Sequence, residues 1–141
     1  ILFHIYSGRL MQSYQQGLGI FIENDGNSIA FNEKPGQEHD AVFSMSSGQL
    51  SALVLSFTLA LNQRYAKHSL LLIDDPVQTL DEINIAGFVD LLRTEFSGRQ
   101  IIMSTHEDRM SAYFRYKYKK FGMSAGRINF MEEARSAIVN R

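Results

Sequence analysis

The spacing of hydrophobic and polar residues changes between helical and strand-like several times along the chain. The segment around which the other predicted elements are organised is residues 69–82. The apolar run Leu70–Ile73 is typical of a strand buried on both faces of a parallel sheet. Asp74 and Asp75 stand where this strand ends, and Pro76 prevents it from continuing. Ligands of open α/β sheets bind at this carboxyl edge. Apolar runs that end in Asp are common in α/β proteins, but adjacent acids at this edge suit magnesium and phosphate chemistry.

Two segments beside this strand have the spacing of amphipathic helices. In residues 48–64 the predicted core positions are Leu50, Leu53, Val54, Phe57 and Leu61, with Ala52, Leu55 and Leu59 widening the face. We therefore expect this helix to be largely buried. The segment after the strand has the same spacing at Ile85, Phe88, Val89, Leu92 and Phe96. Thr79 and Glu82 have the spacing of a capping box at its start, and Gly98 closes it.

The remaining segments complete an alternating order. Residues 1–16 have helical spacing at Leu2, Ile5, Tyr6 and Leu10. Residues 19–23 and 28–31 are strand-like, and the Asp-Gly pair between them predicts a hairpin. A polar loop at 32–40, a strand at 100–105, a helix at 108–120 and a last strand at 127–131 follow. This order predicts an α/β fold in which helices cross over between parallel strands.

Composition narrows the class of protein. The chain has 141 residues, of which 45% are hydrophobic and 11% aromatic, enough for one modest domain with a core. Its formal net charge of −1 gives no overall attraction to nucleic acid or membranes. The absence of cysteine excludes disulfides and thiolate zinc sites, and no run approaches the roughly 18 apolar residues of a membrane span. We expect a cytoplasmic protein, and the start at Ile1 leads us to expect part of a longer one.

Three loops carry polar residues at helix starts or strand ends, and together they resemble the carboxyl-terminal half of an ABC-type ATPase head. The family's signature loop appears as Met45-Ser46-Ser47-Gly48-Gln49, its Walker B strand as Leu70–Asp75, its D-loop around Gln78–Asp81 and its switch histidine as His106. The apolar helix at 50–62 looks like that of the SMC, RecN and SbcC type coiled-coil ATPases, whereas ABC transporter subunits typically carry arginine there. The resemblance implies a P-loop NTPase-like fold with a parallel sheet flanked by helices and an amino-terminal hairpin.

The resemblance also implies an organisation and a set of partners. Residues 1–16 correspond to the end of a helix in the return arm of a coiled coil, and residues 17–141 to the carboxyl-terminal lobe of the head. The cofactors implied are ATP and Mg²⁺. The partners implied are an amino-terminal lobe that carries the Walker A loop, a second ATPase head and DNA, with no membrane. The processes implied are repair, chromosome maintenance or phage defence.

Each motif residue receives a role from the resemblance. Asp74 would hold magnesium through water, Asp75 would position the attacking water, and His106 would contact the γ-phosphate. The signature residues Ser46, Ser47, Gly48 and Gln49 begin a helix whose free amides would meet the γ-phosphate on the partner head. Asp81 would contact the other head across the dimer interface.

The same residues have ordinary structural interpretations. Ser47 has the chemistry of a helix N-cap, Asp81 that of a first-turn acid and His106 that of a loop histidine. The other histidines, His4, His39 and His68, lie in no comparable motif and are expected to be structural.

Two departures from the family pattern bear on activity. The family usually has Glu after the Walker B Asp, whereas Asp75 is one methylene shorter and is a less secure base. No Gly-rich loop ending in Lys-Ser or Lys-Thr occurs in the 141 residues, so nothing in them cradles the α- and β-phosphates. We therefore expect this chain alone to be inactive. A non-catalytic dimerisation module and a transporter subunit are the alternatives.

A cluster of cations and aromatic residues, Tyr113–Phe121, overlaps the end of the predicted helix at 108–120. The window 109–131 contains six bases and no acid. Interleaved aromatic rings and cations suit a nucleic-acid surface. A helix with Phe114, Tyr118 and Phe121 inward and Lys117 and Lys120 solvated accounts for the same pattern.

Overall fold

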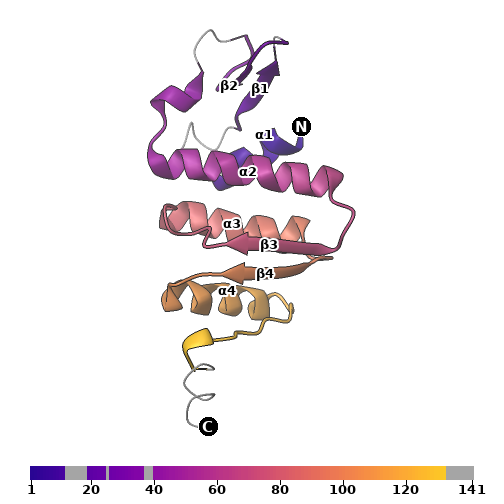
Figure 1. Cartoon of the computed structure of the whole chain (residues 1–141), viewed down its shortest axis with the longest axis vertical. Coiled ribbons are helices and arrows are strands. Elements are labelled where there is room, and N and C mark those ends of the chain that lie inside the picture. Colours follow the sequence, from indigo (N-terminus) through magenta and orange to yellow (C-terminus); the bar gives the residue numbers. More distant parts are fainter. Residues whose placement is uncertain (12–18, 25, 37–39, 133–141) are drawn as a thin grey trace. The chain divides into compact units, whose positions relative to one another are not determined.

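The helices and strands follow the predicted order as far as the last helix (Figure 1). The computed structural model describes residues 1–11, 19–24, 26–36 and 40–132. They belong to two units, Ile1–His106 and Glu107–Arg141. The elements are α1 (Leu2–Leu10), β1 (Phe21–Asn24), β2 (Ile29–Asn32), the short 3-10 helix η2 (Ala41–Ser44), α2 (Ser47–Tyr65), β3 (Leu70–Asp74), α3 (Glu82–Glu95), β4 (Gln100–Ser104) and α4 (Asp108–Lys120).

Two small sheets lie in the first unit. Strands β1 and β2 form the predicted antiparallel hairpin, in which Phe21 is opposite Asn32 and Asn24 is opposite Ile29. Gly26 has a φ of +90°, as a tight turn requires, whereas Asp25 lies outside the described residues. Strands β3 and β4 lie side by side and run in the same direction (Figure 1). The predicted parallel pairing is confirmed.

Strand β3 is less buried than its apolar sequence predicts. Leu71 is buried, but Leu70 is exposed and Leu72 is 67% exposed. The prediction of burial on both faces is wrong for this chain, because the parallel sheet in its described part consists of β3 and β4 alone. One face of this pair therefore presents apolar side chains to solvent.

Helix α2 buries part of the predicted face, at Ala52, Leu53 and Leu59, together with two residues that were not predicted. Its buried residues are Ala52, Leu53, Ser56, Leu59 and Ala60. Leu50 and Leu61 are exposed and Val54 is 57% exposed, so the prediction that this helix is largely buried is wrong. The small residues of the buried face recur every four positions, which suits close approach by α1, a helix that α2 contacts.

Helix α1 contacts α2, α3 and β1. Its buried residues are Phe3, Tyr6, Ser7 and Leu10, so Ile5, a predicted core residue, is exposed. The ring of Phe3 lies 5.7 Å from the rings of both Phe31 and Phe57, which joins α1 to the hairpin and to α2. The predicted helix extends to Gln16, but residues 12–16 lie outside the described part of the chain.

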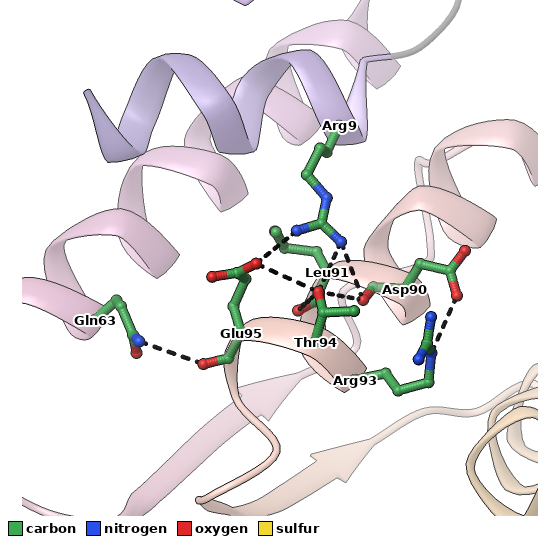
Figure 2. Close-up of polar contacts among 7 residues, drawn as sticks. All are labelled: Arg9, Gln63, Asp90, Leu91, Arg93, Thr94 and Glu95. Carbon is green, nitrogen blue, oxygen red and sulfur yellow. Dashed lines mark hydrogen bonds and ion pairs between the residues drawn. The ribbon is translucent and has the colours of Figure 1, made fainter. Parts of the chain in front are cut away.

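Side chains from two other helices hold the carboxyl-terminal end of α3 (Figure 2). The Arg9 guanidinium of α1 donates to the Glu95 carboxylate at 2.8 Å, to the Thr94 hydroxyl at 2.7 Å and to the Asp90 carbonyl at 3.3 Å. The Gln63 amide of α2 donates to the Glu95 carbonyl at 3.3 Å. The last carbonyls of a helix lack intrahelical donors, so the Gln63 amide satisfies the Glu95 carbonyl, and the Arg9 contacts fix α1 to α3.

The predicted core of α3 is confirmed. All five residues expected on its inner face, including Phe88 and Phe96, are buried. The helix ends at Glu95 with Phe96 as its C-cap, so Gly98 lies two residues beyond the cap. No helix in the described ranges is long and apolar enough to cross a membrane.

The second unit consists of α4 and the segment that follows it. Gly122, with a φ of +76°, follows the C-cap of α4, and the Met123 amide donates to the Tyr118 carbonyl at 3.0 Å. The strand predicted at 127–131 is not formed, because residues 123–129 have no regular structure and residues 130–132 are helical. The Arg127 guanidinium instead pairs with Asp108 at 2.5 Å, so this segment contacts α4 rather than a sheet.

Candidate functional site

The parallel register brings two polar strand ends to one edge of the β3 and β4 pair. Asp74 is opposite Ser104, the last residue of β4, so Asp75 and His106 follow at the same edge. This is the arrangement that apolar strands followed by polar residues predict. The structure therefore brings together Asp74, Asp75 and His106 from separate segments of the sequence.

Ser104 organises this edge, although it was not among the residues predicted to carry chemistry. Its hydroxyl donates a short hydrogen bond to the Asp74 carboxylate. The Asp75 amide donates to the carbonyl of Ser104 at 3.1 Å and lies 3.2 Å from its hydroxyl oxygen. The signal for Ser104 is its position as the register partner of Asp74, which becomes visible only when the two strands are aligned.

The backbone of Asp75 is in the left-handed region, with a φ of 40°, and no other non-glycine residue in the described ranges has a positive φ. This conformation costs about 1 kcal/mol or more for most residues and less for Asp or Asn. The chain turns sharply here, directly after β3. Such a turn at a strand end directs the carboxylate away from the course of the strand.

The Asp75 carboxylate and the His106 imidazole form the central pair of the site. His106 Nδ1 lies 2.7 Å from Asp75 Oδ2, and the two side chains are 61% and 27% exposed respectively. The other oxygen, Asp75 Oδ1, is buried and has no hydrogen-bond partner among the described residues. The pair fixes one edge of the imidazole, which leaves His106 Nε2 for a ligand, and the unpartnered oxygen suits a water molecule.

Asp74 is the residue at this edge best suited to a metal-bound water. Its carboxylate is exposed and is oriented by the Ser104 hydroxyl. Within the described ranges, no group of three His, Cys, Asp or Glu side chains could hold a metal ion by itself. Mg²⁺ is usually bound through one or two carboxylates, several waters and substrate phosphates, so one exposed carboxylate fits a nucleotide-bound Mg²⁺.

The start of α2 is closed by a capping box formed by Ser46 and Gln49. Ser46 Oγ accepts from the Gln49 amide at 3.3 Å, and Gln49 Oε1 accepts from the Ser46 amide at 2.8 Å. The N-cap is therefore Ser46, and the structural interpretation of Ser47 as the cap is wrong. The first-turn amides of Ser47 and Gly48 are among those that the helix itself cannot pair, so they are the donors available to an anion.

Gly48 lies against the loop that follows Asp75. A Cβ atom added at Gly48 would be 2.8 Å from the backbone carbonyl oxygen of Thr79, closer than real Cβ contacts. The start of α2 and the predicted D-loop are therefore in van der Waals contact through a position where a side chain does not fit. This contact joins two of the predicted motifs directly.

We predict that Gly48→Ala lowers the free energy of unfolding of the 141-residue chain by about 1–3 kcal/mol, the usual cost of overpacking. The Thr79 carbonyl is backbone and cannot turn aside as a flexible side chain could. Urea denaturation monitored by circular dichroism measures the change.

Gly98→Ala is the matched control, because a Cβ at Gly98 meets nothing within 4 Å. Since alanine restricts the unfolded chain, this variant should be unchanged or more stable by up to about 1 kcal/mol. An equal loss of stability in both variants would contradict a specific role for the contact between Gly48 and Thr79.

Asp81 is the N-cap of α3. Its carboxylate accepts from the Asn84 amide at 2.7 Å, and Glu82 is the first residue of the helix. The predicted capping box of Thr79 and Glu82 is therefore wrong, because the helix begins two residues later than that box requires. The acid at position 81 has a structural role in this chain, and any contact across a dimer would be additional.

The predicted site residues fall into three places. Asp74, Asp75 and His106 lie at the strand ends, Ser46–Gln49 lie at the start of α2, and Asp81 caps α3. Among the remaining histidines, His4 stacks on Phe21 with ring centroids 4.3 Å apart, which is a structural contact. His68 is exposed, and His39 lies outside the described residues.

Comparisons with known proteins agree with this architecture. No family model and no curated protein matches the sequence. One similar structure comes from a study of ATP-driven dimerization and DNA-stimulated activation of SMC ATPases. It is 19% identical with a TM-score of 0.58, and the alignment covers 79% of this chain and 71% of that one.

A second similar structure is an SmcHead bound to the C-winged helix domain of ScpA. It is 20% identical with a TM-score of 0.54, and the alignment covers 78% of this chain but 34% of that one. Likenesses at this level of identity concern the fold. The chain therefore has the fold of an SMC-type ATPase head, an α/β fold of the P-loop NTPase class.

Proposed function

We propose that this chain is the carboxyl-terminal lobe of an SMC-like ATPase head, which binds and hydrolyses ATP between two dimerised heads. The observation that carries the proposal is the contact of 2.7 Å between Asp75 and His106. These are the two residues that the resemblance assigns to the attacking water and the γ-phosphate, and they meet at a sheet edge suited to ligands. In this proposal residues 1–16 end the return arm of a coiled coil and residues 17–141 form the lobe.

Exposed apolar side chains support the proposal that a second lobe packs against this chain. Leu70, Leu72 and Ile102 are exposed on the β3 and β4 pair, and Leu50, Val54 and Leu61 are exposed on α2. Large exposed apolar patches usually mark an interface. We propose that the amino-terminal lobe covers these faces, extends the sheet and supplies the Walker A loop that the sequence lacks.

The residues of this chain divide the hydrolysis step between them. The Asp75 carboxylate would orient the attacking water, and His106, which Asp75 holds through Nδ1, would offer Nε2 to the γ-phosphate. Asp74 would hold Mg²⁺ through a water. The metal supplies neutralisation of phosphate charge when it is bound.

The second head meets the start of α2 in this proposal. The amides of Ser47 and Gly48 and the positive end of the 19-residue helix α2 would contact the γ-phosphate held by the partner head. The SMC ATPases of the similar structure undergo ATP-driven dimerization and DNA-stimulated activation. By analogy, we propose that ATP turnover here is coupled to DNA transactions in repair, chromosome maintenance or phage defence.

The 141-residue chain alone should neither bind ATP tightly nor hydrolyse it, because the cradle for the α- and β-phosphates lies in the other lobe. Titration calorimetry with Mg²⁺ and ATP, together with a phosphate-release assay, checks both expectations. Co-expression with the matching amino-terminal lobe should restore binding and turnover. Magnesium-dependent turnover by the purified chain would contradict the proposed division of the site between two lobes.

A further inference from the structure

Helix α4 carries two tyrosines and two lysines on one face. Tyr113, Tyr116, Lys117 and Lys120 recur at i, i+3, i+4 and i+7, which places them on one side of the helix. Tyr116 is 59% exposed and Lys120 is exposed, whereas Tyr113 and Lys117 are partly exposed. We call these four residues the tyrosine-lysine stripe.

Each lysine of the stripe lies near the ring of the tyrosine four residues before it. Lys117 Nζ is 5.6 Å from the centroid of the Tyr113 ring, and Lys120 Nζ is 5.9 Å from that of Tyr116. These are cation–π distances. The stripe therefore consists of two neighbouring tyrosine-lysine pairs, each of which combines an aromatic ring with a positive charge.

The structural interpretation of this helix does not account for the two tyrosines. Phe114 is buried and its ring lies 6.4 Å from that of Tyr118, so these residues form the inner face, while Phe121, predicted to join them, is exposed. Lysines in the last turn stabilise a helix through its dipole. Neither effect requires aromatic rings at positions 113 and 116.

Charge around the stripe favours a polyanionic ligand. Residues 109–131 hold six bases and no acid, although the whole chain has a net charge of −1. Arg127 is engaged with Asp108, whereas the contacts of the stripe lysines within the described part of the chain are to tyrosine rings. Their charges are thus not neutralised by those partners and are available to phosphates.

We propose that the tyrosine-lysine stripe binds single-stranded nucleic acid. The lysines would contact phosphates while the tyrosines stack on bases. Duplex nucleic acid keeps the faces of its bases within the stack, so exposed rings favour unpaired strands. Tyr113 and Tyr116 are about 4.5 Å apart along the helix axis, which is comparable to the separation of neighbouring bases.

Fluorescence anisotropy with the 141-residue chain tests this inference without ATP, so its failure would leave the ATPase proposal standing. The probes are a labelled 12-nucleotide single strand, the corresponding duplex and labelled heparin, each titrated at several salt concentrations. We expect the single strand to bind more tightly than the duplex. Tyr113→Leu with Tyr116→Leu should weaken single-strand binding about 30-fold, taking the lower limit for each lost stack, and leave heparin binding unchanged.

Three further double variants separate stacking from charge. Tyr113→Phe with Tyr116→Phe keeps the rings and should bind like the unmodified chain, which also shows that the helix tolerates change there. Lys117→Gln with Lys120→Gln should weaken binding of the single strand and of heparin and reduce the single-strand salt slope by about 1.4. Lys34→Gln with Lys67→Gln removes the same charge from exposed positions in the first unit and should leave that slope unchanged.

Three results would overturn the inference. The first is duplex binding as tight as single-strand binding. The second is single-strand binding that the tyrosine-to-leucine variant does not weaken while circular dichroism shows that it is folded. The third is an equal change of the salt slope in the two lysine variants, which would indicate general electrostatic attraction.

Discussion

Asp75→Asn in the complete head is expected to slow ATP hydrolysis by about 10²–10⁴-fold while leaving ATP-driven dimers long-lived. The change removes one negative charge at the place where the attacking water must be oriented and deprotonated. Asparagine has the same shape and tolerates the left-handed conformation that position 75 adopts, with a φ of 40°. Loss of turnover would therefore report on charge rather than on a strained backbone.

The measurement combines steady-state turnover with the lifetime of the dimer in the presence of ATP. Asp90→Asn is the matched control, because it removes the same charge from the side of α3, where the carboxylate pairs with Arg93. It should keep near-normal turnover. Loss of ATP binding in Asp75→Asn would instead assign Asp75 a role in holding the metal, and unchanged turnover would favour the non-catalytic dimerisation module.

The strand-end part of the site could be predicted because its signals are local. An apolar run followed by polar residues identifies a strand end, and two parallel strands place such ends at one edge. Asp74, Asp75 and His106 follow this logic. The short contact between His106 and Asp75 and the role of Ser104 could not be predicted, because both depend on the register between strands, which the spacing of either strand alone does not contain.

The buried face of α2 could be predicted from the sequence only in part. The predicted face and the observed one share Leu53, but the predicted face extends to Leu50 and Val54 and the observed one to Ser56 and Ala60. Ranking by hydrophobicity favours the face with the larger side chains. The structure buries the side with the small residues. Helices α1 and α2 are in contact, and close approach between helices depends on shape as well as on apolar area.

The start of α2 lies where the sequence predicts it, but its N-cap is Ser46 rather than Ser47. The sequence predicts a helix that begins at the signature loop, and the structure begins it at Ser47. Predicting which serine is the cap requires the reciprocal hydrogen bonds of Ser46 and Gln49, which are formed only in the folded turn. The outcome makes Ser47 a better position for mutation, because a change there leaves the cap intact.

Ser47→Arg is expected to leave nucleotide binding within its own head intact and to prevent two heads from closing around ATP. Ser47 is exposed and follows the N-cap, so the capping box of Ser46 and Gln49 should persist in the variant. The arginine side chain would occupy the space in which the backbone amides approach the γ-phosphate of the opposite head. Nucleotide binding to single heads and turnover of the dimer measure the two effects separately.

A mixed dimer determines whether the loop acts across the interface. When one head carries Ser47→Arg and the other a Walker A change that prevents ATP binding, one composite site has both defects and the other has neither. About half of the activity should then remain, if the two composite sites turn over independently. Both changes in the same head damage both composite sites and should abolish activity. Equal hydrolysis by the two arrangements would show that the loop does not act in trans, and the assignment of Ser46–Gln49 to the partner's γ-phosphate would be wrong.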